Sequence, residues 1–202
     1  MRIGIDFDNT LVRYDALFHK VALEQRLIPP SVAQSKLAVR EHLRAAGNED
    51  AWTEMQGHIY GLRMAEADAY PGSLEFIAWA RGEGIELWIV SHKTRHPFLG
   101  PAHDLHAAAR GWVERFLPAL AAGDRVFFEL TKEAKLERIG ALKLDCFIDD
   151  LPELLLAERF PARTARLLFD PDASFAGDAR VQAFTDWVAL QRHVEEQWTI
   201  RQ

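Results

Sequence analysis

Two aspartates, Asp6 and Asp8, follow a short apolar run near the start of the chain and are separated by one residue. Strand positions two apart face the same side, and at a strand end that runs into a turn the two carboxylates can converge on one ion. Like charges held that close raise each other's pKa unless a cation neutralises them. Hard divalent cations prefer such oxygen ligands. The pair therefore predicts a metal site, with Mg²⁺ as the cofactor.

Apolar runs that are rich in branched and aromatic residues predict the strands that would position these acids. These runs cover residues 3–7, 86–90, 126–128, 146–148 and 166–169. Segments of helical length lie between them, which is typical of a parallel sheet with helices on both faces. We therefore expect an α/β fold with a Rossmann-like core. Ligands of such sheets bind beyond the carboxyl ends of the strands.

The stretch 12–70 interrupts this alternation, because it contains no convincing strand. Three helical patterns can be read there, over 14–25, 31–46 and 48–67. Ser31 is the candidate N-cap of the second helix. We interpret 12–70 as a small all-helical cap domain, and 1–11 together with 71–202 as the α/β core domain. Further helices are expected over 73–81, 107–120 and 185–198.

The composition is that of an ordinary globular protein, with 49% hydrophobic and 27% charged residues in a chain of 202. A formal net charge of -6 argues against binding of nucleic acid through bulk attraction. The single cysteine, Cys146, cannot form an internal disulfide, which favours a reducing, cytoplasmic setting. No stretch has membrane-spanning length, so no membrane partner is expected. The amphipathic terminal helix and six tryptophans leave room for a homodimer interface.

Four motifs occur in order along the chain: Asp6, Asp8 and Thr10; Ser91; Lys132; and Asp149 with Asp150. Together they resemble the motifs of the haloacid dehalogenase superfamily of phosphotransferases. That family carries Asp-x-Asp-x-Thr after the first strand, Ser or Thr after the second, Lys at a later helix start and acidic residues after the fourth strand. The resemblance covers the chain from residue 1 to about residue 169.

The resemblance implies that Asp6 is a nucleophile, whose carboxylate attacks phosphorus to give an aspartyl-phosphate. Asp8 corresponds to the general acid and base, which protonates the leaving oxygen and then takes a proton from the attacking water. Dehalogenases of the family lack this second aspartate, because a halide needs no proton. Its presence therefore disfavours cleavage of a carbon–halogen bond.

The remaining motif residues are implied to bind metal and phosphate. Mg²⁺ would contact the carboxylates of Asp6 and Asp149 and the main-chain carbonyl of Asp8. Asp150 and Thr10 would contact these ligands rather than the ion. Which of Asp149 and Asp150 binds the metal directly is left open.

The phosphoryl group would be bound by Ser91 and the main-chain N–H of His92, and Lys132 would neutralise its charge. Lys135 lies one turn later on the same helix face and is the alternative to Lys132.

A run of basic residues follows the second predicted strand and comprises His92, Lys93, Arg95 and His96. Such a loop would attract a second anionic group of the substrate. The pairs His92/His96 and His103/His106 have the spacing of metal ligands, which leaves zinc as the competing interpretation.

The leading hypothesis is a Mg²⁺-dependent phosphomonoester hydrolase acting on a small phosphorylated metabolite. Sugar phosphates rank ahead of nucleoside monophosphates, and the helical cap would exclude water on closure. A phosphomutase or phosphotransferase, in which Asp6 passes its phosphoryl group to a second substrate hydroxyl, is the alternative among enzymes. A non-catalytic module that binds metal or phosphate is the alternative outside them. End-processing of nucleic acid is disfavoured by the net charge and the expected lid.

Overall fold

The computed structural model describes residues 1–200, and its backbone divides into two compact units. The first, which we call the sheet unit, comprises Met1–Val12, Ala69–His92 and the chain from Ala119 onward. The second, the helical unit, comprises Arg13–Asp68 and Lys93–Pro118. The helical unit thus includes a segment, Lys93–Pro118, that lies outside the predicted cap range. The boundaries of a cap domain stay a prediction.

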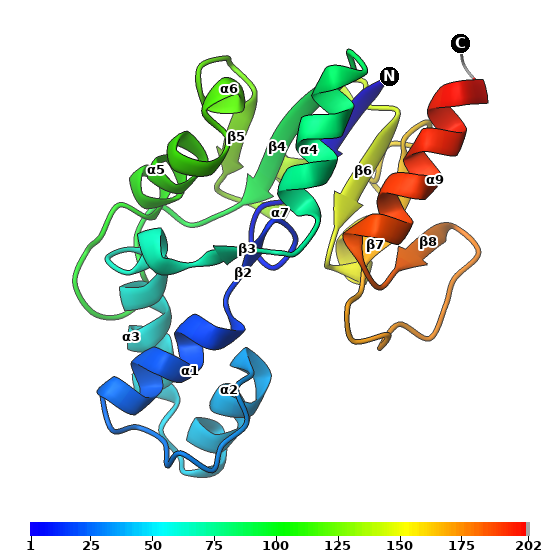
Figure 1. Cartoon of the computed structure of the whole chain (residues 1–202). Helices are drawn as coiled ribbons and strands as arrows, with labels where there is room; N and C mark the ends of the chain where they lie inside the picture. Colours follow the sequence, from blue (N-terminus) through cyan, green and yellow to red (C-terminus); the bar gives the residue numbers. More distant parts are fainter. Residues whose placement is uncertain (201–202) are drawn as a thin grey trace. The chain divides into compact units, whose positions relative to one another are not determined.

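The sheet unit contains a six-stranded parallel sheet with strand order β5-β4-β1-β6-β7-β8 (Figure 1). Its strands are β1 (Arg2–Ile5), β4 (Glu86–His92), β5 (Val126–Glu129), β6 (Cys146–Asp149), β7 (Ala165–Phe169) and β8 (Val181–Phe184). The first five confirm the strands predicted from the apolar runs. The sixth was not predicted, because this edge strand is largely exposed and lacks a continuous apolar run.

The strand order reverses beside β1, which pairs with β4 on one side and with β6 on the other. In doubly wound sheets the crevice beyond the strand ends at this reversal is where ligands bind. The ladder between β1 and β6 continues one residue past the strand, because the main-chain N–H of Asp6 donates to Ile148 O at 2.8 Å. The end of β1 is therefore held rigidly at the reversal.

Helices cover both faces of the sheet. On one face α4 (Ser73–Gly82) packs against α9 (Trp187–Ile200), in front of the sheet in Figure 1. On the other face lie α7 (Lys132–Ala141) and the short α8 (Pro152–Leu155). The apolar core under these two helices joins buried residues of strands and helices: Trp88, Val90, Leu136, Ile139, Leu144, Phe147, Leu154, Leu155, Phe160 and Leu168.

The alternation of side chains along the strands decides which face each acidic residue occupies. Gly4 pairs with Phe147 in the sheet, and Phe147 belongs to the core under α7. Asp6 follows Gly4 by two positions and Asp149 follows Phe147 by two. Both carboxylates therefore extend to the α7 side, at the carboxyl ends of neighbouring strands.

The helical unit consists of α1 (Asp15–Glu24), α2 (Lys36–Ala45), α3 (Glu49–Tyr60), a 3₁₀ turn (Met64–Glu66) and α5 (Leu105–Phe116). The three helical patterns predicted in 12–70 are found as α1, α2 and α3, each shorter than predicted. The expectation that 12–70 contains no strand was wrong in one detail, because β2 (Val12–Arg13) and β3 (Asp68–Ala69) form a two-stranded sheet. These elements are too short to show an apolar run in the sequence. The short α6 (Pro118–Ala121) completes the assignment. None of the helices within residues 1–200 has the length and hydropathy needed to cross a bilayer.

The start of α2 corrects one prediction, because Ser31 is not its N-cap. Ser35 takes that position in an extended conformation, and its hydroxyl accepts a hydrogen bond from the N–H of Ala38 at 3.4 Å. Two serines precede the same apolar pattern, and local sequence does not say which of them leads into the first helical turn.

Gly4 provides a test of the packing of β1 against the apolar core that contains Leu144 and Phe147. A Cβ added there would lie 2.4 Å from Leu144 Cδ1 and 2.6 Å from Phe147 Cδ2. Gly4→Ala should therefore lower the free energy of unfolding by ~1–3 kcal/mol, measured by urea denaturation. Gly82→Ala is the matched control in the same unit, because a Cβ there meets nothing within 4 Å. Equal stability of the two variants would contradict the packing described.

Candidate active site

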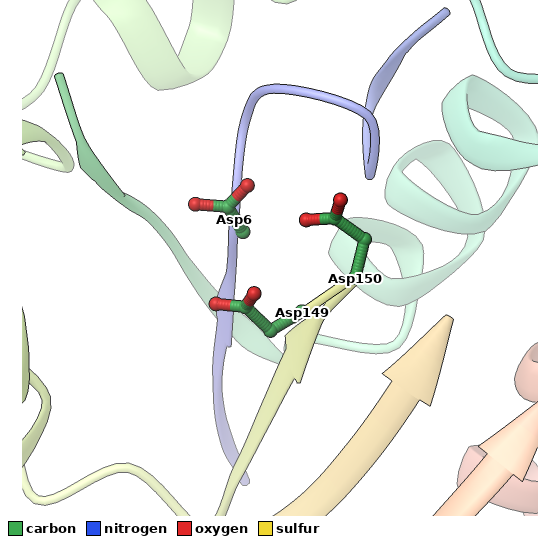
Figure 2. Close-up of side chains that lie close together, drawn as sticks. All are labelled: Asp6, Asp149 and Asp150. Carbon is green, nitrogen blue, oxygen red and sulfur yellow. The ribbon is translucent and has the colours of Figure 1, made fainter. Parts of the chain in front are cut away.

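Three carboxyl groups converge at the reversal of strand order (Figure 2). Asp6 follows β1, Asp149 is the last residue of β6, and Asp150 comes next in the chain. One ligand atom of each lies within 4.8 Å of the others. Within residues 1–200 no second group of three or more His, Cys, Asp or Glu residues has an arrangement that could hold a metal ion.

Two of the four histidines considered as zinc ligands, His96 and His106, contact main-chain carbonyls. His96 Nδ1 lies 3.1 Å from the carbonyl oxygen of His103, and His106 Nε2 lies 2.8 Å from that of Lys93. These ring nitrogens are thus engaged with the main chain of the helical unit. The arrangement does not support zinc binding by the histidine pairs.

Lys135 is the centre of the carboxylate cluster. Its Nζ lies 2.5 Å from Asp6 Oδ1 and 2.6 Å from Asp149 Oδ2, and its side chain is only 2% exposed. The side chain projects from the first turn of α7, on the face that carries the buried Leu136 and Ile139. One buried ammonium therefore links the ends of two neighbouring strands.

Burial and the neighbouring charges both shift the pKa values of Lys135 and Asp149. Burial alone would lower the pKa of Lys135, but the carboxylates of Asp149 and Asp6 outweigh it and raise that pKa above its ordinary value. Burial raises the pKa of Asp149, and the Asp6 carboxylate adds to this, although the Lys135 ammonium lowers it. The net effect is a pKa of Asp149 above its ordinary value, because burial and the Asp6 carboxylate outweigh the Lys135 ammonium.

The cluster fits a divalent cation by its charge and by its donor atoms. When ionised, the three carboxylates and the one ammonium leave a net charge of −2. All the donors are hard oxygens, the set that Mg²⁺ and Ca²⁺ prefer. Residues Asp6, Asp149 and Asp150 could therefore hold such an ion, although nothing in the cluster selects one divalent metal over another.

The loop after β1 reverses the chain tightly. The main-chain N–H groups of Leu11 and Val12 both donate to the carbonyl of Phe7, at 3.1 and 3.0 Å. Asn9 has a positive φ of 57°, a conformation that asparagine tolerates better than most residues. This role of Asn9 was not predicted, although an Asn at the centre of a motif that must turn is the signal for it.

Thr10 joins the loop to the cluster through its hydroxyl. It is fully buried, and its hydroxyl lies 3.5 Å from Asp6 Oδ2 and 3.4 Å from Asp150 Oδ1. Asp8 is half-buried two residues earlier in the same loop. The threonine hydroxyl therefore lies between two of the three carboxylates.

Ser91 and His92 end β4, the other neighbour of β1. Ser91 is buried and His92 half-buried. Burial lowers the pKa of His92, and the nearby Lys135 ammonium lowers it further. The structure thus brings both residues to the same sheet edge as Asp6.

The two candidate lysines of α7 have different surroundings. Lys132 is the first residue of the helix, its side chain is 45% exposed, and its Nζ lies 3.3 Å from Glu153 Oε1. Lys135 is the one that contacts the carboxylates. Its position within the apolar face of the helix, beside Leu136, was the signal that could have favoured it.

Replacing the two lysines separately tests this difference. In metal-free protein, Lys135→Met should cost about 3–5 kcal/mol of unfolding free energy, because Asp6 and Asp149 remain buried without their cation. Lys132→Met, the matched control, should cost less than about 1 kcal/mol, since its ion pair is exposed.

The cost of Lys135→Met should also depend on pH. Loss of the ammonium raises the pKa of Asp149 still further above its unfolded value. Such a group contributes stability at low pH that is lost as pH rises through the folded pKa. The penalty measured by urea denaturation should therefore be larger at mildly alkaline than at mildly acidic pH. A penalty independent of pH would contradict the burial of charge at this site.

Comparison with known proteins relates the fold to hydrolases. No protein-family model matches the chain. A protein of Oceanobacillus iheyensis, named a "putative nucleotidase", is 24% identical over 165 residues, which cover 77% of this chain and 79% of that protein.

Solved structures match over nearly the whole chain. A HAD family hydrolase from Deinococcus radiodurans with bound phosphate and sodium has a TM-score of 0.60 at 16% identity, over 96% of this chain and 95% of that one. A "predicted phosphatase" from Clostridium acetobutylicum has a TM-score of 0.58 at 14% identity, over 96% and 98%. The resemblance seen in the motifs is thereby confirmed at the level of the fold: this chain has the haloacid dehalogenase fold of these hydrolases and phosphatases.

Proposed function

We propose that the chain is a Mg²⁺-dependent phosphomonoester hydrolase that acts on a small phosphorylated metabolite through an aspartyl-phosphate. The observation that carries the proposal is the buried carboxylate of Asp6, held by Lys135 beside two further acids at the reversal of strand order. The fold supports it, since the solved structures that share this fold include hydrolases and phosphatases.

In this mechanism Asp6 forms the covalent bond to phosphorus, and Asp8 carries out the proton transfers. An oxygen of Asp6 attacks phosphorus, the P–O bond to the leaving group breaks, and Asp8 gives its proton to the leaving oxygen. Asp8 then takes a proton from water. The resulting hydroxide attacks phosphorus, which frees Asp6 and releases inorganic phosphate.

The surrounding groups would stabilise the charge on the phosphoryl oxygens. Ser91 and the main-chain N–H of His92 donate hydrogen bonds from the end of β4. Of the two lysines of α7 we assign the electrostatic role to Lys135, because it already contacts Asp6. A bound Mg²⁺ would supply further positive charge and offset the repulsion between Asp6 and the phosphoryl group.

We assign direct metal binding to Asp6, the main-chain carbonyl of Asp8 and Asp150. Asp149 is less suited, because one of its oxygens accepts from Lys135 and the other from the N–H of Leu151 at 2.9 Å. Asp149 is also fully buried, whereas Asp150 is half-buried. Asp149 would therefore fix Lys135, and Asp150 would contact the ion.

Sugar phosphates and nucleoside monophosphates are the two substrate classes that we propose to compare. The relative named a nucleotidase favours the second. A phosphomutase differs only in that a second substrate hydroxyl, rather than water, receives the phosphoryl group from Asp6. A need for a bisphosphate primer would reveal it.

The activity is tested by phosphate release from a panel of sugar phosphates, nucleoside monophosphates and small acid phosphates, with and without Mg²⁺. Asp6→Asn should lower turnover by at least about a thousandfold, because the amide is a poor nucleophile. Asp172→Asn, an exposed acid in a surface turn, is the control and should retain activity. Full activity of Asp6→Asn would exclude the covalent mechanism.

The metal assignment is tested by titrating Mg²⁺ into Asp149→Asn and Asp150→Asn and measuring the heat of binding. Asp150→Asn should weaken Mg²⁺ affinity by about tenfold or more with little loss of stability. Asp149→Asn should mainly lower the free energy of unfolding, because it removes a partner of Lys135. If Asp150→Asn binds Mg²⁺ as tightly as the unmodified protein, the assignment is wrong.

A further inference from the structure

One side chain far along the sequence contacts the loop that carries Asp8. The indole N–H of Trp187 donates to the main-chain carbonyl of Thr10 at 3.3 Å, although the two residues are 177 positions apart. Thr10 is the residue whose hydroxyl lies between Asp6 and Asp150. Its main chain and its side chain thus link Trp187 to the carboxylate cluster.

The position of Trp187 is itself tightly constrained. It is the first residue of α9 and is 1% exposed. Its ring lies 5.2 Å from that of Phe76 and 5.6 Å from that of Phe169, measured between centroids. Gly72, at φ 85°, approaches so closely that a Cβ there would lie 2.9 Å from Trp187 Cβ. The indole therefore has little freedom to follow a moving loop.

Another attachment of this loop is made by main-chain atoms alone. The main-chain N–H of Tyr70 donates to the carbonyl of Leu11 at 2.8 Å, a contact that any residue except proline could make at that position. The contact from Trp187 depends on a side-chain N–H. Unlike a main-chain contact, it can therefore be removed by a single conservative substitution.

We propose that Trp187 is a positioning residue for the catalytic loop, and that through the Thr10 carbonyl it sets where Asp8 and the Thr10 hydroxyl lie. This inference rests on the proposed function, since it assigns Asp8 as the acid that the loop must place. Loss of the indole N–H frees a buried carbonyl, so the loop gains alternative positions. We therefore expect the rate of proton transfer from Asp8 to fall more than the free energy of unfolding of the protein.

The test uses Trp187→Phe, which keeps an aromatic ring and removes the N–H. Trp112→Phe is the matched control: Trp112 is equally buried and its N–H also donates to a main-chain carbonyl, that of Ala67 at 2.8 Å. Both variants lose the same kind of hydrogen bond and similar ring volume. Only Trp187 is linked to Thr10.

Two measurements are made on both variants. The first is hydrogen exchange at the amides of Leu11 and Val12, which reports the order of the loop independently of activity. The second is kcat for glycerol 3-phosphate and for p-nitrophenyl phosphate. The alkoxide leaving group needs protonation, whereas nitrophenolate needs little.

Trp187→Phe should lose protection at these amides. Its kcat for glycerol 3-phosphate should fall by about tenfold or more, and for p-nitrophenyl phosphate by less than about threefold. Trp112→Phe should retain protection, and any fall in its kcat should be equal for both esters.

Unchanged protection of the loop in Trp187→Phe overturns the inference, and so does an equal fall in kcat for both esters. If the unmodified protein hydrolyses neither these esters nor the panel above, the proposed function fails, and hydrogen exchange alone decides the role of Trp187. If Trp187→Phe does not fold, benzothienylalanine at position 187 replaces the N–H by sulfur within the same ring shape, and the same two readouts apply.

Discussion

The buried contact of Lys135 with Asp6 and Asp149 is the interaction on which the rest of the site depends. Removing a carboxylate or an ammonium from water costs several kcal/mol unless the charges are paired closely. Here one ammonium meets two carboxylates at 2.5 and 2.6 Å, almost without exposure to solvent. The contact requires β1 and β6 to be neighbours and α7 to cover their shared face. The ion pairs therefore depend on both the strand order and the packing of α7 on the sheet.

Even with this contact, the site carries more negative than positive charge, because three carboxylates face one ammonium. Lys135 neutralises part of the cluster, and the remaining excess of carboxylate makes the site attractive to a divalent cation. Adjacent acids can then have different tasks. Asp149 is fully buried and accepts hydrogen bonds on both oxygens, whereas Asp150 is half-buried at the start of the next loop. The proposed assignment of the ion to Asp150 rests on this difference. An Asp-Asp pair at a strand end thus places one acid inside the core and one at its edge.

The loop after β1 shows how a distant part of the chain contributes to such a site. The turn closes on the carbonyl of Phe7 through local hydrogen bonds. Its position relative to the sheet, however, depends on contacts from the turn before α4 and from the first residue of α9. A cluster of aromatic rings around Trp187 supplies the rigidity. The C-terminal helix is therefore part of the support of the site as well as of the core.

Much of this arrangement was predictable from the sequence, because local patterns determine where strands end. Five apolar runs predicted five of the six strands of the parallel sheet, and the α/β fold was predicted correctly. Asp6 and Asp8 were singled out because they stand at the end of a predicted strand, where ligands of such sheets bind, whereas Ser91 and Asp149 were assigned through the resemblance of the motifs. The exposed edge strand β8 was missed, since its residues show no apolar pattern.

Only the tertiary structure decided between residues that are equivalent in local pattern. Lys132 and Lys135 are one turn apart on one helix, and Ser31 and Ser35 precede the same helical pattern. Which lysine is buried depends on how α7 packs on the sheet, and the contact between Trp187 and Thr10 joins residues 177 positions apart. By itself the sequence determined the kinds of chemical group and the strand ends that carry them. The pairing of those groups was decided by packing, because contacts between distant segments form only when the sheet and its helices assemble.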